Sequence, residues 1–206
     1  MVFMNVLNIE HVSKIFGDKK IFDDISYGIH DGDKIGIIGI NGTGKSTLLK
    51  IIAGEEETDE GQVISQNGLR ITYLPQMPDF PKGAIVQDYV ADGKWQKDWS
   101  TESEARNILN KLGITEHDVP VEQLSGGQKK RVALARTLVN PSDVLILDEP
   151  FNAMDKESME EVHDLLQRFK AQNKTVLLAS HSAEDIARAC DVIYEMEDGG
   201  LHLVKQ

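Results

Sequence analysis

The stretch KIGIIGINGTGKSTLLKIIAG, residues 34–54, constrains the fold of this chain more than any other segment. Its first part is an apolar run that predicts a strand, and its last part predicts a helix. The loop between them, from Gly39 to Ser46, fits the phosphate-binding pattern G-x-x-x-x-G-K-[ST], called the P-loop. Glycines let backbone N–H groups turn inward around phosphate oxygens, and the following helix directs its partial positive charge at the same anion. We therefore predict a nucleotide site, in which Lys45 reaches the β- and γ-phosphates and the Ser46 hydroxyl binds Mg²⁺.

Length, charge and cysteine content limit the classes of protein to which the chain can belong. Its 206 residues suffice for one domain with a small lobe. No apolar run reaches the about 18 residues of a membrane span, and the polar-interrupted first nine residues do not predict a signal peptide. The single cysteine, Cys190, excludes an internal disulfide and suits a reducing cytoplasm. The formal net charge of −12 argues against broad contact with RNA or DNA phosphates, and the only visible basic cluster is 129–131.

The order of the predicted elements indicates an α/β fold. Apolar runs without alternation favour parallel strands that are covered on both faces, and the Asn67-Gly68 turn predicts a hairpin of two short strands. Between residues 84 and 123 short helices predominate, which predicts a helical lobe of about 77–123 inserted into a core formed by 1–76 and 124–206. The predicted strands are 5–12, 21–29, 34–39, 61–66, 70–74, 143–147, 174–179, 191–196 and 201–204, and the predicted helices outside the lobe are 44–54, 125–139, 155–172 and 182–189.

A second motif, LILDEP at residues 145–150, places two carboxylates directly after an apolar run. A buried strand that ends this way presents them at the carboxyl edge of the sheet, where ligand sites of α/β proteins form. We expect Asp148 to bind Mg²⁺, in the Walker B role, and Glu149 to orient and polarise an attacking water. The alternative is an ordinary strand end with solvated acids, which the upstream P-loop disfavours.

The third motif is LSGGQ at residues 124–128. Ser125, Gly126 and Gly127 at the start of a predicted helix would supply a hydroxyl and backbone N–H donors, which makes a second phosphate site. Here the sequence resembles the ATP-binding cassette (ABC) family, whose signature is LSGGQ, and the resemblance extends over essentially the whole chain. In that family two cassettes pack head to tail, so that each ATP lies between one P-loop and the signature of the other subunit.

The remaining family motifs can be placed one at a time. Phe16 stands where the family stacks an aromatic ring on adenine, although a core Phe in a strand pair is the alternative. Gln76 matches the Q-loop, Asp155 the D-loop that communicates across the dimer, and His181 the switch histidine that contacts the γ-phosphate. The resemblance thus implies an ATP-binding set of Phe16, Gly39, Asn41, Gly42, Thr43, Gly44, Lys45, Ser46, Thr47, Ser125, Gly126, Gly127, Gln128 and Asp155, a Mg²⁺ set of Ser46, Gln76 and Asp148, and a catalytic set of Lys45, Gln76, Glu149 and His181.

The two halves of the chain resemble different branches of the family. Residues 5–76 and 101–138 are similar to the first cassette of ABC-F proteins, which are soluble translation factors and ribosome-protection proteins. In contrast, PFNAMD at 150–155 and ASHSAEDI at 179–186 are more similar to transporter cassettes. A natural hybrid, a divergent member and an engineered chimera all fit this pattern.

The function that we favour from the sequence is ATP hydrolysis by a cassette dimer that serves as the ATP-binding subunit of a transporter. The chain has one cassette and no long charged insertion between Gln76 and Leu124 of the kind that ABC-F proteins extend into the ribosome. The expected partners are a second cassette, identical or related, and a separate transmembrane subunit, which would place the chain in the cytoplasm at the inner face of the membrane. An ABC-F-like ATPase that binds the ribosome, or an isolated or chimeric cassette derived from one, is the alternative. No direct DNA binding is expected.

Overall fold

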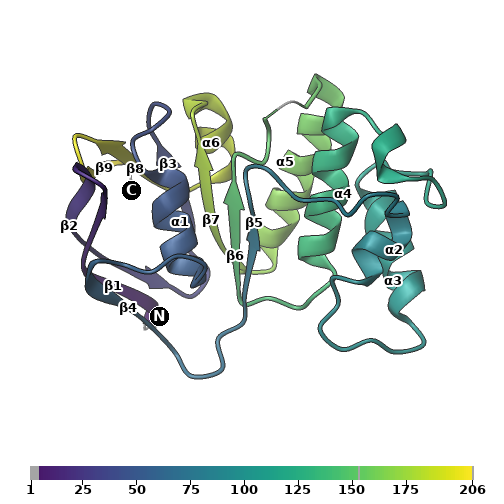
Figure 1. Ribbon diagram of the computed structural model, residues 1–206, viewed down its shortest axis with the longest axis horizontal. Coiled ribbons are helices and arrows are strands. Elements are labelled where there is room, and N and C mark those ends of the chain that lie inside the picture. Colours follow the sequence, from purple (N-terminus) through teal and green to yellow (C-terminus); the bar gives the residue numbers. More distant parts are fainter. Residues whose placement is uncertain (1–4, 153, 206) are drawn as a thin grey trace.

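The computed structural model of the protein describes residues 5–152 and 154–205, which form two sheets and the helices around them (Figure 1). A three-stranded antiparallel sheet has the order β2-β1-β4, and a six-stranded sheet has the order β5-β6-β7-β3-β8-β9, in which only β9 runs antiparallel to its neighbour. The strands are β1 (Asn5–Phe16), β2 (Lys19–His30), β3 (Lys34–Ile38), β4 (Glu60–Ser65), β5 (Ile71–Leu74), β6 (Val144–Asp148), β7 (Thr175–Ser180), β8 (Val192–Glu197) and β9 (Gly200–Lys205). The helices are α1 (Lys45–Ala53), α2 (Val86–Ala91), α3 (Thr101–Lys111), α4 (Gly126–Leu138), α5 (Lys156–Ala171) and α6 (Ala183–Ala189), with a short 3₁₀ turn, η1, at Val121–Gln123.

The parallel strands are buried on both faces, as their continuous apolar runs predict. In β6, Val144 and Ile146 join the cluster that contains the apolar residues of α1, β1 and β2, whereas Leu145 and Leu147 join the cluster that contains α4, α5 and α6. Successive side chains of a strand point to opposite faces, so an apolar run places one half of itself in each core. The predicted α/β class, with a mixed sheet and an antiparallel N-terminal sheet, is confirmed.

The predicted hairpin around Asn67-Gly68 is wrong, although the turn itself is present. Leu69 N–H donates to the Gln66 carbonyl at 3.1 Å, but β4 pairs with β1 and β5 pairs with β6 in the other sheet. Burial explains the difference: most of β4 is exposed at a sheet edge, whereas Thr72 and Leu74 of β5 are buried. The turn therefore carries the chain from one sheet to the other.

Helices α2 and α3 lie at the end of the molecule opposite β1, β2 and β4, and both pack against α4 (Figure 1). Their contacts are apolar: Val90, Leu109 and Leu134 are fully buried members of one cluster. We expect these helices to form the inserted lobe of about residues 77–123. Within the described part of the chain, no helix combines the length and the apolar character that crossing a membrane requires.

Candidate nucleotide site

The P-loop connects β3 to α1, and the side chain of Lys45 folds back along it. Its Nζ atom donates to the carbonyl oxygens of Gly39 at 2.7 Å and Ile40 at 3.2 Å, and lies 3.9 Å from Oε1 of Glu149. Burial lowers the pKa of the Lys45 ammonium, and the negative charges of Glu149 and Asp148 oppose that shift. A positive charge is thus held beside the start of α1, where the helix N-terminus already favours an anion.

Gly44 precedes α1 in a left-handed conformation, with φ at 105°, and a Cβ there would lie 2.5 Å from Cγ2 of Ile21 on β2. We expect Gly44→Ala to cost about 1–2 kcal/mol of unfolding free energy for the backbone conformation and a further 1–3 kcal/mol or so for the crowding of Ile21. Gly42→Ala is the matched control, because Gly42 has φ at 87° but no atom within 4 Å of its Cβ position. Denaturant unfolding of both variants measures the difference, and equal losses would contradict the crowding.

Two buried carboxylates lie at the end of β6. Asp148 is its last residue, 1% exposed, and Glu149, 3% exposed, has a φ of 48° that is unusual for a residue with a side chain. The Glu149 N–H donates to the Ala179 carbonyl of β7 at 2.9 Å, which fixes this strained backbone. Burial raises the pKa of the Asp148 carboxyl, and the hydroxyls of Ser46 and Tyr73 act in the opposite direction. The Tyr73 hydroxyl donates to Oδ2 of Asp148 at 3.3 Å.

The donor atoms around Asp148 fit a magnesium ion. Among the described residues, Oδ1 of Asp148 and Oε1 of Glu149 are buried without a hydrogen-bond partner. Unpaired buried oxygens are costly unless a ligand completes their contacts. Mg²⁺ characteristically takes one or two protein oxygens and fills its remaining positions with water and phosphate. The Asp148 carboxylate and the Ser46 hydroxyl supply such a set, and no cluster of three or more His, Cys, Asp or Glu ligands occurs in the described ranges.

His181 follows β7 and contacts Glu149. Its Nδ1 lies 2.9 Å from Oε2 of Glu149, and an ionised carboxylate there would accept a hydrogen bond from Nδ1–H. The His181 side chain is 55% exposed, whereas that of Glu149 is 4% exposed. The imidazole therefore has one nitrogen on the carboxylate and an open side toward solvent, where a phosphate could be contacted.

A cavity of about 400 Å³ brings most of the predicted cis residues together. It is lined by Phe16 at the end of β1, by the P-loop and the start of α1, by Gln76 after β5, and by Glu149 after β6. The predicted residues in its lining are Phe16, Asn41, Gly42, Gly44, Lys45, Ser46, Thr47, Gln76 and Glu149. Gly39 and Thr43 lie in the same loop and support it: Gly39 accepts from Lys45, and the Thr43 hydroxyl donates to the Ile40 carbonyl at 3.0 Å.

The signature and D-loop residues lie outside that lining. Ser125 caps α4: its hydroxyl accepts from Gln128 N–H at 3.2 Å, and the Gln128 amide oxygen accepts from Ser125 N–H at 2.9 Å. Ser125 and Gly126 are exposed, whereas Gly127 is buried. Asp155 caps α5 by accepting from Ser158 N–H at 2.8 Å, a bond that lowers the pKa of its carboxyl. Ala153, in the D-loop motif, lies outside the described residues.

Sequence reasoning missed Lys130. The basic cluster at 129–131 is not a surface patch, because Lys130 and Arg131 are 5% and 8% exposed. The Lys130 ammonium donates to the main-chain carbonyl of Gln76 at 2.6 Å, and burial lowers its pKa to about 8 against the charges of Asp148 and Glu149. The available signal was its position: residue 130 lies two positions beyond the signature, on a helix that contacts β5.

Comparisons with known proteins agree with this geometry. The profile of a family described as "ABC transporter" matches residues 22–152, more than half of the chain. An uncharacterized ABC transporter ATP-binding protein, YfmR of Bacillus subtilis, is 35% identical over 98% of this chain, and one from Methanocaldococcus jannaschii is 33% identical over 94%. The chain spans 38% of the first relative and 74% of the second. A bacterial ABC transporter cassette solved as a dimer has a TM-score of 0.87 at 25% identity, covering 97% of this chain and 98% of its own.

Proposed function

The chain belongs to the ABC transporter family of ATP-binding proteins, and we propose that it hydrolyses ATP in a head-to-tail dimer that drives a membrane transporter. One observation supports the dimer most strongly. The cavity gathers the P-loop, Gln76 and Glu149 from one chain, whereas Ser125 and Gly126 are exposed outside its lining. A second cassette would bring its own exposed signature to that cavity. The same fold has been solved as a dimer, and in a dimeric post-hydrolysis state bound to ADP and phosphate.

The roles that we propose for the site residues combine their contacts with the resemblance to the family. Lys45 and the backbone N–H groups of the P-loop hold the β- and γ-phosphates. Ser46 and Asp148 would hold Mg²⁺, with Gln76 as a further candidate ligand, and a bound ion would supply positive charge for the phosphates. Glu149 accepts a proton from the attacking water, and His181 contacts the γ-phosphate while its Nδ1 stays on Glu149. The partner contributes Ser125 to Gln128 as hydrogen-bond donors, and Asp155 lies at the contact between subunits.

Dimerisation predicts that specific ATPase activity rises with protein concentration. At concentrations below the dissociation constant of the ATP-bound dimer, most chains are monomers that lack a signature at their site. Turnover per chain, measured from nanomolar to micromolar protein at saturating MgATP, should increase and then level off. A constant turnover per chain, together with a monomeric mass in the ATP-bound state, would contradict a site shared by two subunits.

A groove on the surface of the chain could bind the proposed membrane partner. A hollow of about 310 Å³ lies between β5, the segment after it, α2 and α4, with Tyr73, Pro75, Tyr89, Trp95, Arg136 and Asn140 in its lining. The Arg136 guanidinium lies over the Tyr89 ring at 4.6 Å from its centroid. Mixed aromatic, proline and arginine surfaces are typical of protein-binding sites. We propose that a cytoplasmic helix of a transmembrane subunit binds in this groove, beside Gln76.

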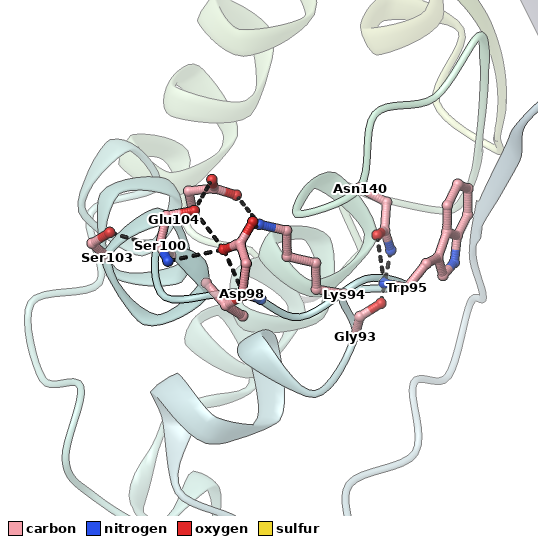
Figure 2. A network of polar contacts seen from close by, with 9 residues as sticks. Gly93, Lys94, Trp95, Asp98, Ser100, Ser103, Glu104 and Asn140 are labelled. Carbon is pink, nitrogen blue, oxygen red and sulfur yellow. Dashed lines mark hydrogen bonds and ion pairs between the residues drawn. The ribbon is translucent and has the colours of Figure 1, made fainter.

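Polar contacts fix the rim of the groove (Figure 2). The Asn140 side chain accepts from the N–H of Trp95 at 2.9 Å and donates to the carbonyl of Gly93 at 2.7 Å, which holds Trp95 at the edge. Lys94 next to it pairs with Glu104 of α3 at 2.7 Å and with Asp98 at 3.5 Å. Hydrogen bonds to Asn140 and ion pairs of Lys94 therefore hold the segment 93–95 in place, and Trp95 is 55% exposed in this fixed position. Such pre-organisation lowers the entropic cost of binding.

Photo-crosslinking can test which partner the groove binds. A photo-reactive amino acid at Thr137, in the groove, should crosslink to a protein with membrane-spanning helices in the native host, as identified by mass spectrometry. The same amino acid at the exposed Ser65, on the edge strand β4, is the control and should not give that product. Crosslinks from Thr137 to ribosomal proteins, with ATP-dependent co-sedimentation with ribosomes, would replace the transporter proposal by the ABC-F-like alternative.

A further inference from the structure

The ammonium of Lys130 has three hydrogen-bond acceptors, and all of them are main-chain carbonyls. Nζ lies 2.6 Å from the oxygen of Gln76, 3.3 Å from that of Pro75 and 3.5 Å from that of Asp148. A lysine ammonium has three donors and no acceptor, so these contacts use all of its capacity. One side chain on α4 thereby connects the segment after β5 with the end of β6.

This arrangement is expensive for the fold. Lys130 is 5% exposed and makes no ion pair among the described residues, although the charges of Asp148 and Glu149 oppose the lowering of its pKa. Burying a charge without a paired counter-ion costs free energy, and an apolar side chain of similar size would fill the same space at lower cost. A buried charge of this kind beside a ligand cavity points to a role in function.

We propose that Lys130 is a positioning residue of the hydrolytic site, which holds the Gln76 backbone in register with Asp148 and with the helix that carries the signature. Ser125 and Gly126 begin α4, and Lys130 lies about one helical turn further along the same helix. A displacement of α4 when its N-terminus contacts the partner's ATP would therefore move Gln76 in its own site. This inference rests on the proposed position of the signature at the partner's ATP. Lys130 would then connect the signature, which contacts one ATP, with Gln76, which lies beside the other.

The substitution Lys130→Met removes the donors and keeps the apolar stem. We expect kcat for ATP hydrolysis to fall on the order of 10- to 100-fold, because small displacements of positioning groups have effects of that size. The KM for ATP and the affinity for ADP should change less than about twofold, because the P-loop lysine is untouched. Lys130→Gln, whose amide still donates to a carbonyl, should recover a large part of kcat. Lys50→Met, the same change at an exposed position of α1, is the control and should leave kcat unchanged.

A label near Gln76 gives a second readout that a purely structural lysine would not affect. Met77 is 86% exposed, and the native Cys190 is buried, with a thiol pKa raised to about 12, so Met77→Cys can be labelled selectively. In the wild-type background, MgATP should change the fluorescence of a polarity-sensitive dye there, and in Lys130→Met most of this change should be lost while ADP still binds.

Two results would overturn the proposal: a folded Lys130→Met protein with kcat within twofold of wild type, or an undiminished dye response in it. If Lys130→Met does not fold, the same two measurements on Lys130→Gln test the proposal. A kcat of Lys130→Gln that falls to the level of background hydrolysis would then contradict it. Failure of the proposed function itself would appear differently, as wild-type protein whose turnover per chain does not depend on its concentration.

Discussion

Glu149→Gln should reduce ATP turnover at least ~100-fold while leaving ATP binding intact, since general-base catalysis contributes factors of about 10² to 10⁴. The amide has nearly the shape of the carboxylate but cannot take a proton from water. Because the γ-phosphate is not cleaved, the two cassettes should stay together in ATP as a dimer that size-exclusion chromatography with light scattering detects. Turnover is measured as phosphate release at saturating MgATP.

The control for this experiment is Glu157→Gln, the same change at an exposed position in the first turn of α5, which should not alter turnover. Thermal unfolding of both variants establishes that they fold. Turnover of Glu149→Gln within a few-fold of wild type would assign the proton acceptor to another group. A variant that neither hydrolyses ATP nor dimerises in ATP would instead assign Glu149 to nucleotide binding.

Mixing the two inactive variants Lys45→Ala and Ser125→Arg should restore part of the ATP turnover. A homodimer of Lys45→Ala lacks the lysine in both sites, and a homodimer of Ser125→Arg blocks both signatures. In the mixed dimer one site has both defects, but the other combines an intact P-loop with an intact signature. Random assortment makes half of the dimers mixed, with one of two sites intact, so the mixture should recover about a quarter of wild-type turnover.

A site contained within one chain predicts the opposite, which is no recovery at any mixing ratio. Ser125 also caps α4, so Ser125→Arg should lose about 1 kcal/mol of stability through the missing cap. Ser125→Gly keeps the signature open and costs little at a cap position, but it lacks the hydroxyl; it should therefore retain more turnover than Ser125→Arg and less than wild type. This comparison separates the steric block from the loss of the hydroxyl.

The features that were predictable from the sequence are local ones. The P-loop, the acidic pair at the end of β6 and the helix that begins at the LSGGQ motif each depend on residues within a few positions of one another, and the structure has them on the expected elements. The class of fold followed from apolar runs of the length of buried strands, which need cover on both faces. The roles of the site residues toward ATP were inferred from the motifs and from the family resemblance, and they stay predictions.

The missed features depend on contacts between distant segments. The turn at Asn67-Gly68 is a good hairpin turn by its own chemistry, but the buried position beside β6 determined the pairing of β5. Likewise, the sequence shows Lys130 as one of three consecutive basic residues, and such a run normally predicts a solvated surface. Only the packing of α4 against the ends of β5 and β6 brings its ammonium to three carbonyls. The residues next to these positions in the sequence therefore do not predict either contact.

The buried oxygens of Asp148 and Glu149 that lack hydrogen bonds to other described residues would make the proposed nucleotide a contributor to the stability of this fold as well as a substrate. In the chain without ligand, and among its described residues, Oδ1 of Asp148 has no hydrogen bond, Oε1 of Glu149 has only the Lys45 ammonium at 3.9 Å, and the backbone at Glu149 is strained. A ligand that binds there relieves those costs only in the folded state. If that ligand is the proposed MgATP, the population of unfolded chains should fall as the MgATP concentration rises. On this proposal, a cell depleted of ATP would contain more unfolded copies of this protein, and the protein would be more sensitive to proteolysis.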